Sequence, residues 1–358
     1  MKKITFITED ISFRAGVERV QAIIANELAK EYDVEIISLF NEKDDNAYRI
    51  NENVKVTKLF HKIKRKYFKF LYVFLYIYLK FYFRNFRTDV LIVTEVRTFS
   101  IFKFMRKKTN LMVWEHLNSY IGKEIVGKFY EIGRKDASKF ANKIIVLTDK
   151  DKAHYKELYN IKDPQIIRIY NPIEMINQTH KYDINSKKIL SIGRISGQKG
   201  FDYLVEIAKI VFEKHSDWQW HIYGEGPEKE KIQILINNNK LEKNIILMGQ
   251  TNQMQNLYKN YSIFVMTSRF EGFPMVNIEA HSAKLPIVSF DCPCGPSEMI
   301  IDGVNGYLID CFDVEKMAEK INYLIENPDI RQKMSDNTSK DKEKLKMENI
   351  IEEWKKIL

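Results

Sequence analysis

The chain has 358 residues, 45% of them hydrophobic, and a formal net charge of +9. This length accommodates two domains of ordinary size, and the hydrophobic content supports a packed core in each. The positive charge predicts an anionic partner, which can be a nucleotide, a nucleic acid or an anionic membrane surface.

The cysteine content and the hydropathy pattern exclude several classes of protein. The three cysteines, Cys292, Cys294 and Cys311, are too few and too clustered for a disulfide framework, and they lack the partner pair that a zinc site needs. The apolar run of the first strand ends at Glu9, which makes it too short for a signal peptide. The longest uncharged apolar run, 70–79, is half the length of a spanning helix. We therefore expect a cytoplasmic protein with reduced thiols that does not cross the membrane.

In the first half of the chain, short apolar runs alternate with amphipathic segments, which predicts parallel α/β units. The expected strands are 3–8, 34–40, 54–59, 90–94, 111–115, 143–148 and 166–170. Helices are expected between them, for example over 16–30 and 121–141. The polar stretch 177–188 has the composition of a linker between domains.

The second half repeats this alternation. The expected strands are 188–193, 218–223, 245–249, 262–267, 286–291 and 306–309, and the expected helices are 201–215, 229–238 and 314–326. Two doubly wound, Rossmann-like domains follow from this order, over 1–175 and 186–335. The carboxyl ends of their two sheets, where open α/β sheets bind ligands, are expected to face a central cleft.

Two carboxylates, Glu271 and Glu279, lie eight positions apart where the strand 262–267 gives way to a helix. Pro274 suits the first turn of that helix, because the missing N–H of proline has no partner to lose there. Free amide groups at a helix start, flanked by two carboxylates, can bind the hydroxyl groups of a sugar. On spacing alone, the alternative is two solvated acids.

The segment 193–200 follows the first strand of the second domain and combines glycines with Arg194 and Lys199. Glycines at a strand-to-helix turn allow close backbone approach, and two cations in front of a helix start suit a diphosphate. The alternative is a pair of ordinary surface cations.

These motifs, in this order, resemble glycosyltransferase family 4, the group-1 type of retaining enzymes with the GT-B fold. The family's signatures are E-x7-E, here in its E-G-F-P form, and G-R-x4-K-G. The resemblance is to bacterial enzymes that assemble surface polysaccharides or lipid-linked oligosaccharides. It also implies that a C-terminal helix, about 340–358, crosses back to the first domain.

The resemblance implies a role for each motif residue. Arg194 and Lys199 would neutralise the departing nucleotide diphosphate, and Glu279 would bind the ribose hydroxyls. Glu271 and the backbone amides that follow it would bind the sugar hydroxyls. The donor site would then include the following residues: Gly272, Phe273, Pro274, Met275 and Val276.

Two further residues belong to the first domain. The loop 9–19 has a single glycine, Gly16, so it lacks the G-x-G-x-x-G of a dinucleotide site and resembles instead the family's first loop, with Ala15 in place of one glycine. Gly16 is interpreted as a donor contact, with a packing role as the alternative. His116 matches the family's cleft histidine, and we expect it to position substrate or act electrostatically rather than as the general base.

The donor base and the metal requirement have weaker signals. The segment 291–298 resembles a D-C-P-T-G-P-S-E stretch of enzymes that use UDP-hexoses, with Cys294 in place of threonine, and this favours uridine over guanosine.

Asp149 and Asp151 match the D-x-D metal motif of another glycosyltransferase class, but their place at the start of a helix indicates a cap. We expect no cofactor and no metal.

The region 61–87 is rich in cations and aromatic residues. On a helical projection seven of its cations fall within about 60° of one line, and aromatic residues cover the other faces. The seven are Lys62, Arg65, Lys66, Lys69, Lys80, Arg84 and Arg87. This pattern indicates an interfacial helix on anionic lipid that could also guide a lipid diphosphate toward the cleft. One alternative is a buried helix with snorkelling cations. A third interpretation is nucleic-acid binding, for which the sequence has no supporting motif. The cations assigned to the membrane or acceptor are Lys62, Lys66, Lys69, Lys80, Arg84 and Arg87.

The sequence thus predicts an enzyme that transfers a hexose or N-acetylhexosamine from a UDP-linked donor to a glycan or polyprenyl-diphosphate-linked acceptor. It would work peripherally on the inner face of the cell membrane, without a nucleic-acid partner. Two alternatives remain open: a nucleotide-sugar epimerase or hydrolase on the same fold, and a non-catalytic module that binds glycan or membrane.

Overall fold

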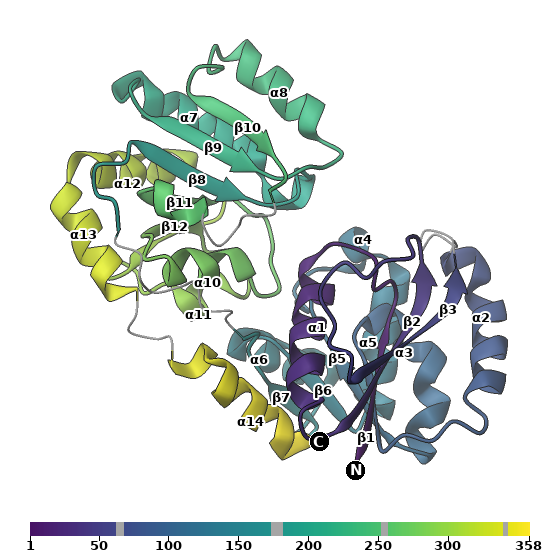
Figure 1. The fold of residues 1–358 in the computed structure, drawn as a ribbon. Helices are drawn as coiled ribbons and strands as arrows, with labels where there is room; N and C mark the ends of the chain where they lie inside the picture. The colour runs from purple at the N-terminus through teal and green to yellow at the C-terminus, as the bar shows by residue number, and fades with distance from the viewer. Residues whose placement is uncertain (62–67, 173–181, 252–256, 339–342) are drawn as a thin grey trace. The chain divides into compact units, whose positions relative to one another are not determined.

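The computed structural model describes residues 1–61, 68–172, 182–251, 257–338 and 343–358 (Figure 1). The chain divides into two compact units. Unit 1 comprises Met1–Pro172 and Glu348–Leu358, and unit 2 comprises Ile173–Met347. Each unit has its own parallel sheet and its own hydrophobic core.

Unit 1 is built on a seven-stranded parallel sheet in the order β3-β2-β1-β4-β5-β6-β7. Its central strands are rich in β-branched residues and are buried on both faces, as expected where helices cover both sides, whereas the edge strands are only partly buried. The strands are β1 (Lys3–Thr8), β2 (Asp33–Asn41), β3 (Val54–His61), β4 (Val90–Val93), β5 (Asn110–Trp114), β6 (Lys143–Val146) and β7 (Ile166–Arg168).

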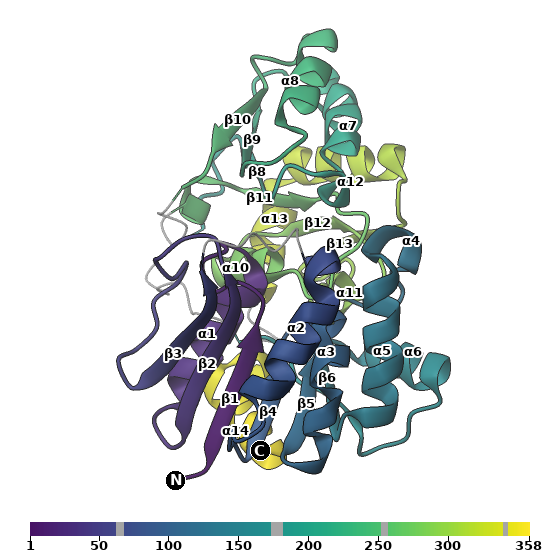
Figure 2. The same ribbon diagram turned by 90° about the vertical axis from the view of Figure 1, so that its right-hand side faces the viewer.

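Helices cover both faces of this sheet. The helices of unit 1 are α1 (Gly16–Leu28), α2 (Phe68–Tyr82), α3 (Val96–Phe102), η2 (Lys103–Lys107), α4 (Lys123–Val126), α5 (Lys128–Phe140), α6 (Asp149–Tyr159) and α14 (Met347–Ile357). Helices α2, α3 and α5 lie on one face (Figure 2), where Leu79, Phe99 and Ala137 join a single core cluster.

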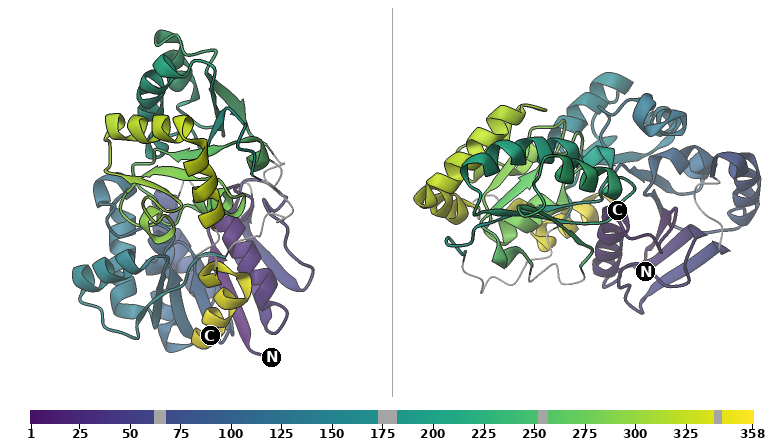
Figure 3. Two further views of the ribbon diagram at one scale, coloured as in Figure 1. Left: turned by 90° about the vertical axis from the view of Figure 1, so that its left-hand side faces the viewer. Right: turned by 90° about the horizontal axis from the view of Figure 1, so that it is seen from above.

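The C-terminal helix α14 completes the opposite face of the unit 1 sheet. Trp354 is fully buried there, and its ring lies 6.5 Å from Phe6 and 4.8 Å from Trp114. Lys355 pairs with Glu31, just beyond α1, at 2.7 Å, and α14 lies beside α1 in Figure 3. The helix α14 is therefore a structural part of unit 1 and packs on its sheet.

Unit 2 contains a six-stranded parallel sheet in the order β10-β9-β8-β11-β12-β13. Its first strand in sequence, β8, lies in the middle of the sheet, as β1 does in unit 1. The strands are β8 (Lys188–Ile192), β9 (Gln219–Tyr223), β10 (Ile245–Gly249), β11 (Ile263–Met266), β12 (Ile287–Phe290) and β13 (Gly306–Ile309).

Two core clusters lie on the two faces of this second sheet. One is formed largely by α7 and α12, and the other includes residues of η4 and α10. The helices of unit 2 are η3 (Gly197–Lys199), α7 (Phe201–Lys214), α8 (Lys229–Asn238), η4 (Tyr258–Asn260), α10 (Met275–Ser282), α11 (Pro296–Met299), α12 (Val314–Glu326), α13 (Pro328–Asn337) and η5 (Glu343–Leu345).

The predicted fold class, two doubly wound parallel α/β domains, is confirmed. The helix expected over 121–141 is broken in two, because Gly127 has φ +88° between α4 and α5. Helix α10 begins at Met275, so Pro274 is its N-cap rather than its first-turn residue. The helix expected over about 340–358 begins only at Met347. Residues 177–181 of the expected linker, 177–188, lie outside the described residues.

Helix α2 corrects the expectation of a helix over 61–87. It spans Phe68–Tyr82, so Arg84 and Arg87 follow it rather than belong to it. Lys62 and Lys66 lie outside the described residues. One side of α2 is buried in the core, as the alternative of a buried helix expects, and the other side exposes large apolar side chains.

No helix among 1–61, 68–172, 182–251, 257–338 and 343–358 combines the length and apolar character that crossing a membrane requires.

Candidate active site

Each sheet has a topological switch point, where the strand order reverses. It falls between β1 and β4 in unit 1 and between β8 and β11 in unit 2. Loops diverge at such a point and leave a crevice outside the carboxyl ends of the strands, which is where open α/β sheets bind ligands. The predicted donor residues follow β8 and β11, the strands on either side of the unit 2 switch point.

An ion pair joins the loops after β8 and β11. Lys199 Nζ lies 2.6 Å from Glu271 Oε1, and both side chains are largely shielded from solvent. The two loops also exchange backbone contacts: Gln198 Nε2 donates to the Phe270 carbonyl at 3.1 Å, and the Arg269 N–H donates to the Gln198 carbonyl at 2.8 Å. The predicted diphosphate cation and the predicted sugar-binding carboxylate therefore contact each other.

Gly200 allows the two loops to approach this closely. Its φ of +62° lies in the left-handed region, and a Cβ at this position would stand 2.1 Å from the Thr267 carbonyl oxygen. Thr267 Oγ1 in turn donates to the Lys199 carbonyl at 3.1 Å. Only glycine can adopt this conformation without strain and also leave room for the carbonyl oxygen of Thr267.

Arg269, two positions before Glu271, also links these two loops. Its guanidinium makes two hydrogen bonds with Asp202, at 2.9 and 2.6 Å, and a third with the Gly197 carbonyl at 2.7 Å. The hydrogen bond with Asp202 raises the pKa of Arg269 despite the opposing effect of burial. Arg269 is thus a cation that the fold already uses, unlike Arg194.

Arg194 is exposed at the end of β8. Within the described part of the chain, its guanidinium has no ion pair or hydrogen bond. A guanidinium that is always charged and available can take a phosphate in a bidentate geometry. This arrangement is consistent with the diphosphate role that the resemblance implies, which remains a prediction.

A hydrogen bond from Tyr258 orients the second glutamate of the motif, Glu279. Glu279 lies in α10 and is almost buried, and its Oε2 accepts a 2.6 Å hydrogen bond from the hydroxyl of the fully buried Tyr258. A hydrogen bond to a carboxylate of this length fixes the orientation of the acid. Tyr258 has no signal in the sequence, since nothing there links it to a glutamate 21 positions away.

The loop after β12 supports the turn between the two glutamates. Gly295 has φ +101°, and a Cβ there would stand 2.4 Å from Pro274 Cδ and 3.4 Å from the Gly272 carbonyl. Cys292, on the same loop, is buried, and burial together with the nearby charge of Glu271 raises the pKa of its thiol. The thiol is therefore neutral, as expected for a reduced structural cysteine.

His116 follows β5 in unit 1, at the carboxyl edge of the first sheet. Its ring packs 4.4 Å from the Trp114 ring, and its buried Nε2 has no hydrogen-bond partner among the described residues. Burial lowers the pKa of His116 to about 3. The imidazole is therefore neutral at physiological pH, which suits a hydrogen-bonding or positioning role and disfavours a cationic one.

A buried arginine fixes the loop that carries His116. Arg134, from α5, lies 3.0 Å from Glu115 and donates to the carbonyl groups of Asn118 and Ile121 at 2.8 and 3.0 Å. This network is nearly inaccessible to solvent. This network could not be predicted from the sequence, because Arg134 lies in a helix of mixed charge with no motif around it.

Gly16 is the first residue of α1, and its N-cap, Ala15, is extended. A Cβ on Gly16 would meet nothing within 4 Å, so no contact among the described residues of unit 1 requires a glycine for packing. The space in front of the α1 start is compatible with ligand contact, which remains a prediction.

The helix α6 is capped as the sequence predicts. Thr148 is the N-cap residue, and its hydroxyl accepts from the Asp151 N–H at 3.0 Å. Asp151 is itself buried, accepts hydrogen bonds from Ser119 N–H and Oγ, and has a pKa raised by burial to about 6. The predicted helix start is therefore confirmed, but its cap is Thr148, and the Asp151 carboxylate binds Ser119 instead of capping the helix.

The site residues thus form two sets. Arg194, Lys199, Glu271 and Glu279 follow or lie beside adjacent strands of unit 2, whereas Gly16 and His116 lie at the carboxyl edge of the unit 1 sheet. The residues that support both sets were not predicted from the sequence. Arg269 alone had a usable signal, because it stands two positions before Glu271.

Comparison with solved structures defines the fold. A mutant of S. aureus TarM, in complex with fondaparinux, alpha-GlcNAc-glycerol and UDP, superposes with a TM-score of 0.85 at 20% identity, covering 100% of this chain and 99% of that one. Two Rossmann-like units with this likeness define the GT-B fold.

Sequence comparison then gives the family. Residues 14–175 match the model described as Glycosyltransferase Family 4, and residues 173–341 match the model described as Glycosyl transferases group 1. An uncharacterized glycosyltransferase of Haemophilus influenzae is 32% identical over 365 residues, covering 100% of both chains. The chain belongs to the group-1 glycosyltransferases of family 4.

Two further relatives of full length carry more specific names. The amylovoran biosynthesis glycosyltransferase AmsD of Erwinia amylovora is 27% identical, covering 100% of both chains. An alpha-1,4-N-acetyl-D-galactosaminyltransferase of Campylobacter jejuni, whose named substrate is a glycan on diNAcBac-PP-undecaprenol, is 25% identical and covers 100% of this chain and 98% of its own. The chain is therefore related to enzymes of polysaccharide and glycan assembly.

Proposed function

We propose that this glycosyltransferase is a retaining enzyme that transfers a hexose or N-acetylhexosamine from a UDP-sugar to a glycan acceptor in surface polysaccharide biosynthesis. The observation that carries the proposal is the Lys199–Glu271 pair at the β8/β11 switch point, next to the exposed Arg194. This places a cation for the diphosphate next to a carboxylate for the sugar. The arrangement matches the donor, in which the sugar is bonded directly to the diphosphate.

Donor binding would redistribute these charges. The diphosphate would bring two cations, Arg194 and Lys199, onto its oxygens, and Glu271 would accept hydrogen bonds from sugar hydroxyls. Glu279, oriented by Tyr258, would accept from the ribose hydroxyls. Cations in a shielded site also stabilise the charge that develops on the leaving diphosphate, and this is the main catalytic contribution that we assign to the chain.

The transfer itself would occur on one face of the sugar. The bond between the anomeric carbon and the diphosphate oxygen breaks, a bond to the acceptor hydroxyl forms on the same face, and the acceptor proton passes to the departing diphosphate. No side chain is required as nucleophile. His116, neutral because burial lowers its pKa, would orient the donor sugar or the acceptor by hydrogen bonding.

Donor and acceptor classes have separate support. TarM was solved with UDP, and the 291–298 segment resembles enzymes that use UDP-hexoses. The Campylobacter relative acts on an undecaprenol-linked glycan, which supports a polyprenyl-diphosphate-linked acceptor here. Such an acceptor resides in a membrane, so we place the enzyme peripherally on the inner face of the cell membrane. The cations around α2, among them Lys80, Arg84 and Arg87, would face the lipid, and no metal or cofactor would be needed.

Nucleotide release tests the proposal. The purified protein is incubated with UDP- and GDP-sugars, with and without a glycan acceptor, and the Lys199→Ala variant serves as the matched control. Release from a UDP-sugar that requires acceptor and falls in the variant supports transfer. Release without acceptor would instead indicate an epimerase or hydrolase, and no release together with no UDP-induced rise in melting temperature would indicate a non-catalytic module.

A further inference from the structure

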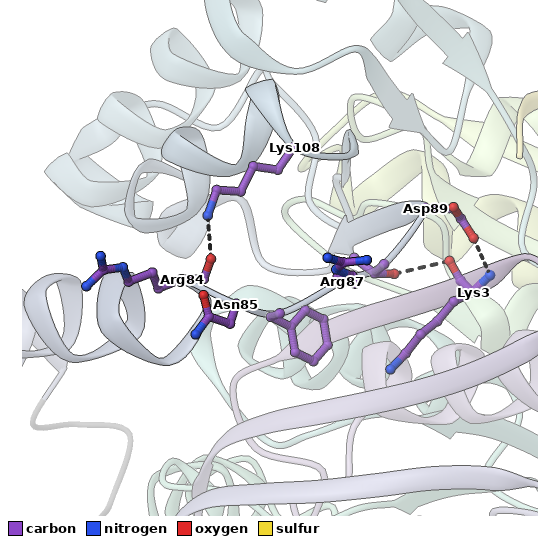
Figure 4. Close-up of a pocket in the computed structure, with 8 residues that line it drawn as sticks. Lys3, Arg84, Asn85, Arg87, Asp89 and Lys108 are labelled. Carbon is purple, nitrogen blue, oxygen red and sulfur yellow. Dashed lines mark hydrogen bonds between the residues drawn. The ribbon is translucent and has the colours of Figure 1, made fainter.

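An open pocket of about 700 Å³ lies where α2 ends and the chain returns to the sheet (Figure 4). Four cations stand among its lining residues. The lining residues are Lys3, Arg84, Asn85, Phe86, Arg87, Thr88, Asp89 and Lys108. In Figure 4, Arg84 and Lys108 come from one side and Lys3 and Asp89 from the other.

The pocket is separate from the candidate active site. Lys3 begins β1 and Asp89 directly precedes β4, so the pocket lies at the amino edge of the unit 1 sheet. His116 follows the opposite, carboxyl end of β5. The cations of the pocket are therefore not explained by donor binding in this unit.

Two of the four cations are available to a ligand. Lys3 Nζ pairs with Glu35 at 3.0 Å, and Lys108 Nζ donates to the Arg84 carbonyl at 2.8 Å. Arg84 and Arg87 are exposed, and their guanidinium groups have no partner within the described residues. Asp89 already accepts the Lys3 N–H at 2.7 Å. The pocket thus presents two unpaired guanidinium groups, which favour a phosphate.

An exposed apolar face of α2 runs up to this pocket. Val73 is 69% exposed and Phe81 70%, and Phe74 and Ile77 are also exposed. At about 100° per residue, these four side chains lie within roughly 100° of one another, and Lys80 lies about 20° beyond this sector. Arg84, which follows the helix, lines the pocket. Leu75, Leu79 and Phe83, on the opposite side, are buried in the core. Large apolar side chains exposed together mark an interaction surface.

We propose that the pocket binds the phosphate of an anionic phospholipid while the exposed face of α2 lies in the interfacial region of the bilayer. The proposal rests on the membrane location given under the proposed function and names the lipid chemistry that holds the enzyme there. Charge complementarity selects a membrane over a protein partner: residues 68–88 carry four cations and no acid. The apolar side chains supply the rest of the affinity, because interfacial binding scales with buried apolar area plus attraction to anionic lipid.

Vesicle co-sedimentation of the full chain tests the proposal. The vesicles are phosphatidylcholine alone or phosphatidylcholine mixed with phosphatidylglycerol. A basic residue near an anionic surface contributes about fivefold in affinity, so Arg84→Gln/Arg87→Gln should bind the mixed vesicles roughly 25-fold more weakly. The matched control, Lys209→Gln/Lys333→Gln, removes two exposed cations of unit 2 and should change binding less than threefold. Ile77→Ser/Phe81→Ser should weaken binding to both kinds of vesicle.

Three results would overturn the proposal. Equal losses in the two charge variants would mean that only the net charge matters. Displacement of the protein from vesicles by millimolar inorganic phosphate, more than by equal ionic strength of chloride, would mean that the pocket takes free phosphate. A dimer in solution that Ile77→Ser/Phe81→Ser abolishes, without vesicle binding, would mean that the face is a protein interface. Melting temperatures within a few degrees of the wild type show that the variants fold.

Vesicle binding is measured without donor or acceptor. A failure here therefore leaves the transferase proposal standing, and an absence of sugar transfer leaves this one standing.

Discussion

Lys199 Nζ and Glu271 Oε1 lie 2.6 Å apart, although 72 positions separate them in the sequence. The pair links the loops that follow β8 and β11, the two strands at the switch point of unit 2. Each charge neutralises the other at a place where solvent access is limited. A buried or half-buried ion pair is costly to disrupt, because removal of one partner leaves the other uncompensated. In the proposed function, a diphosphate would replace Glu271 as the partner of Lys199 and would release the carboxylate for the sugar.

Replacement of Lys199 tests its part in this exchange. Lys199→Ala should lower kcat/KM for the nucleotide sugar by about 10²- to 10³-fold, the range for loss of one group that stabilises a developing anion. The control, Lys214→Ala, removes an exposed lysine at the far end of α7 and should stay within twofold of wild type. Donor kinetics that are equal in the two variants would show that Lys199 is only structural.

Tyr258 should act through Glu279. Tyr258→Phe removes the 2.6 Å hydrogen bond to the carboxylate and leaves the ring in place. Hydrogen bonds to charged groups contribute about 1.5–3 kcal/mol, so KM for the UDP-sugar should rise at least tenfold. The preference for UDP over its 2′-deoxy analogue, measured by competition, should shrink in the same variant.

The neighbouring Tyr261 provides the control for this prediction. Its hydroxyl bonds to His221 at 2.9 Å rather than to a motif residue. If Tyr261→Phe changes the ribose preference as much as Tyr258→Phe, then Tyr258 has no special link to Glu279.

The close approach at Gly200 predicts a stability effect. Gly200→Ala adds a Cβ 2.1 Å from the Thr267 carbonyl oxygen at a φ of +62°, whereas Gly303→Ala has a similar φ of +72° and meets nothing within 4 Å. The strain of a left-handed alanine is about 1–2 kcal/mol and should appear in both variants. Urea denaturation should show an additional loss of about 2 kcal/mol or more for Gly200→Ala. Equal losses would mean that the loops move apart easily.

His116 should make the protein less stable in acid. Its pKa falls from the ordinary 6.5 to about 3 because burial disfavours the imidazolium. Above pH 6.5 the ring is neutral in both states and contributes nothing. Between pH 6.5 and 3, the unfolded chain takes up a proton that the folded chain does not, so the free energy of unfolding decreases. From pH 7 to pH 5 this decrease is about 2 kcal/mol.

A His116→Gln variant isolates this contribution from other titrating groups. Asp151, whose pKa burial raises to about 6, acts in the opposite sense, because the folded state gains a proton as the pH falls through 6. The difference between wild type and His116→Gln in urea unfolding, followed from pH 7 to pH 5, removes the Asp151 effect. A difference that does not change with pH would show that the imidazole remains accessible to protons.

Metal removal should leave the transfer rate unchanged. Arg194 and Lys199 would supply the positive charge that a divalent ion provides in other phosphate sites, so dialysis against EDTA should change turnover less than twofold. A loss that Mg²⁺ or Mn²⁺ restores would contradict this assignment.

The sequence predicted the elements well where their pattern is local. The bounds of β1, α8, β10, β13 and α12 agree with the expected ranges, because hydrophobic periodicity and turn residues depend on neighbours along the chain. The expectation failed for 121–141, where a single glycine with positive φ divides an otherwise continuous helical pattern. It also missed α13, which starts at Pro328 directly after α12.

The motif residues were likewise found from the sequence, but their supports were not. Glu271, Glu279, Arg194 and Lys199 stand out because their chemistry and spacing are typical of a site. Tyr258 and Arg134 stand out only through distant contacts, with Glu279 and with the backbone beside His116.

The sequence by itself determined the alternation of strands and helices, the motifs and the family resemblance, because each depends on residues near one another in the chain. The tertiary structure decided which loops meet. The sheet places β8 beside β11, which brings Lys199 against Glu271. It also decided which side of α2 is buried, because a helix that is apolar on most faces does not reveal which of them the sheet will cover.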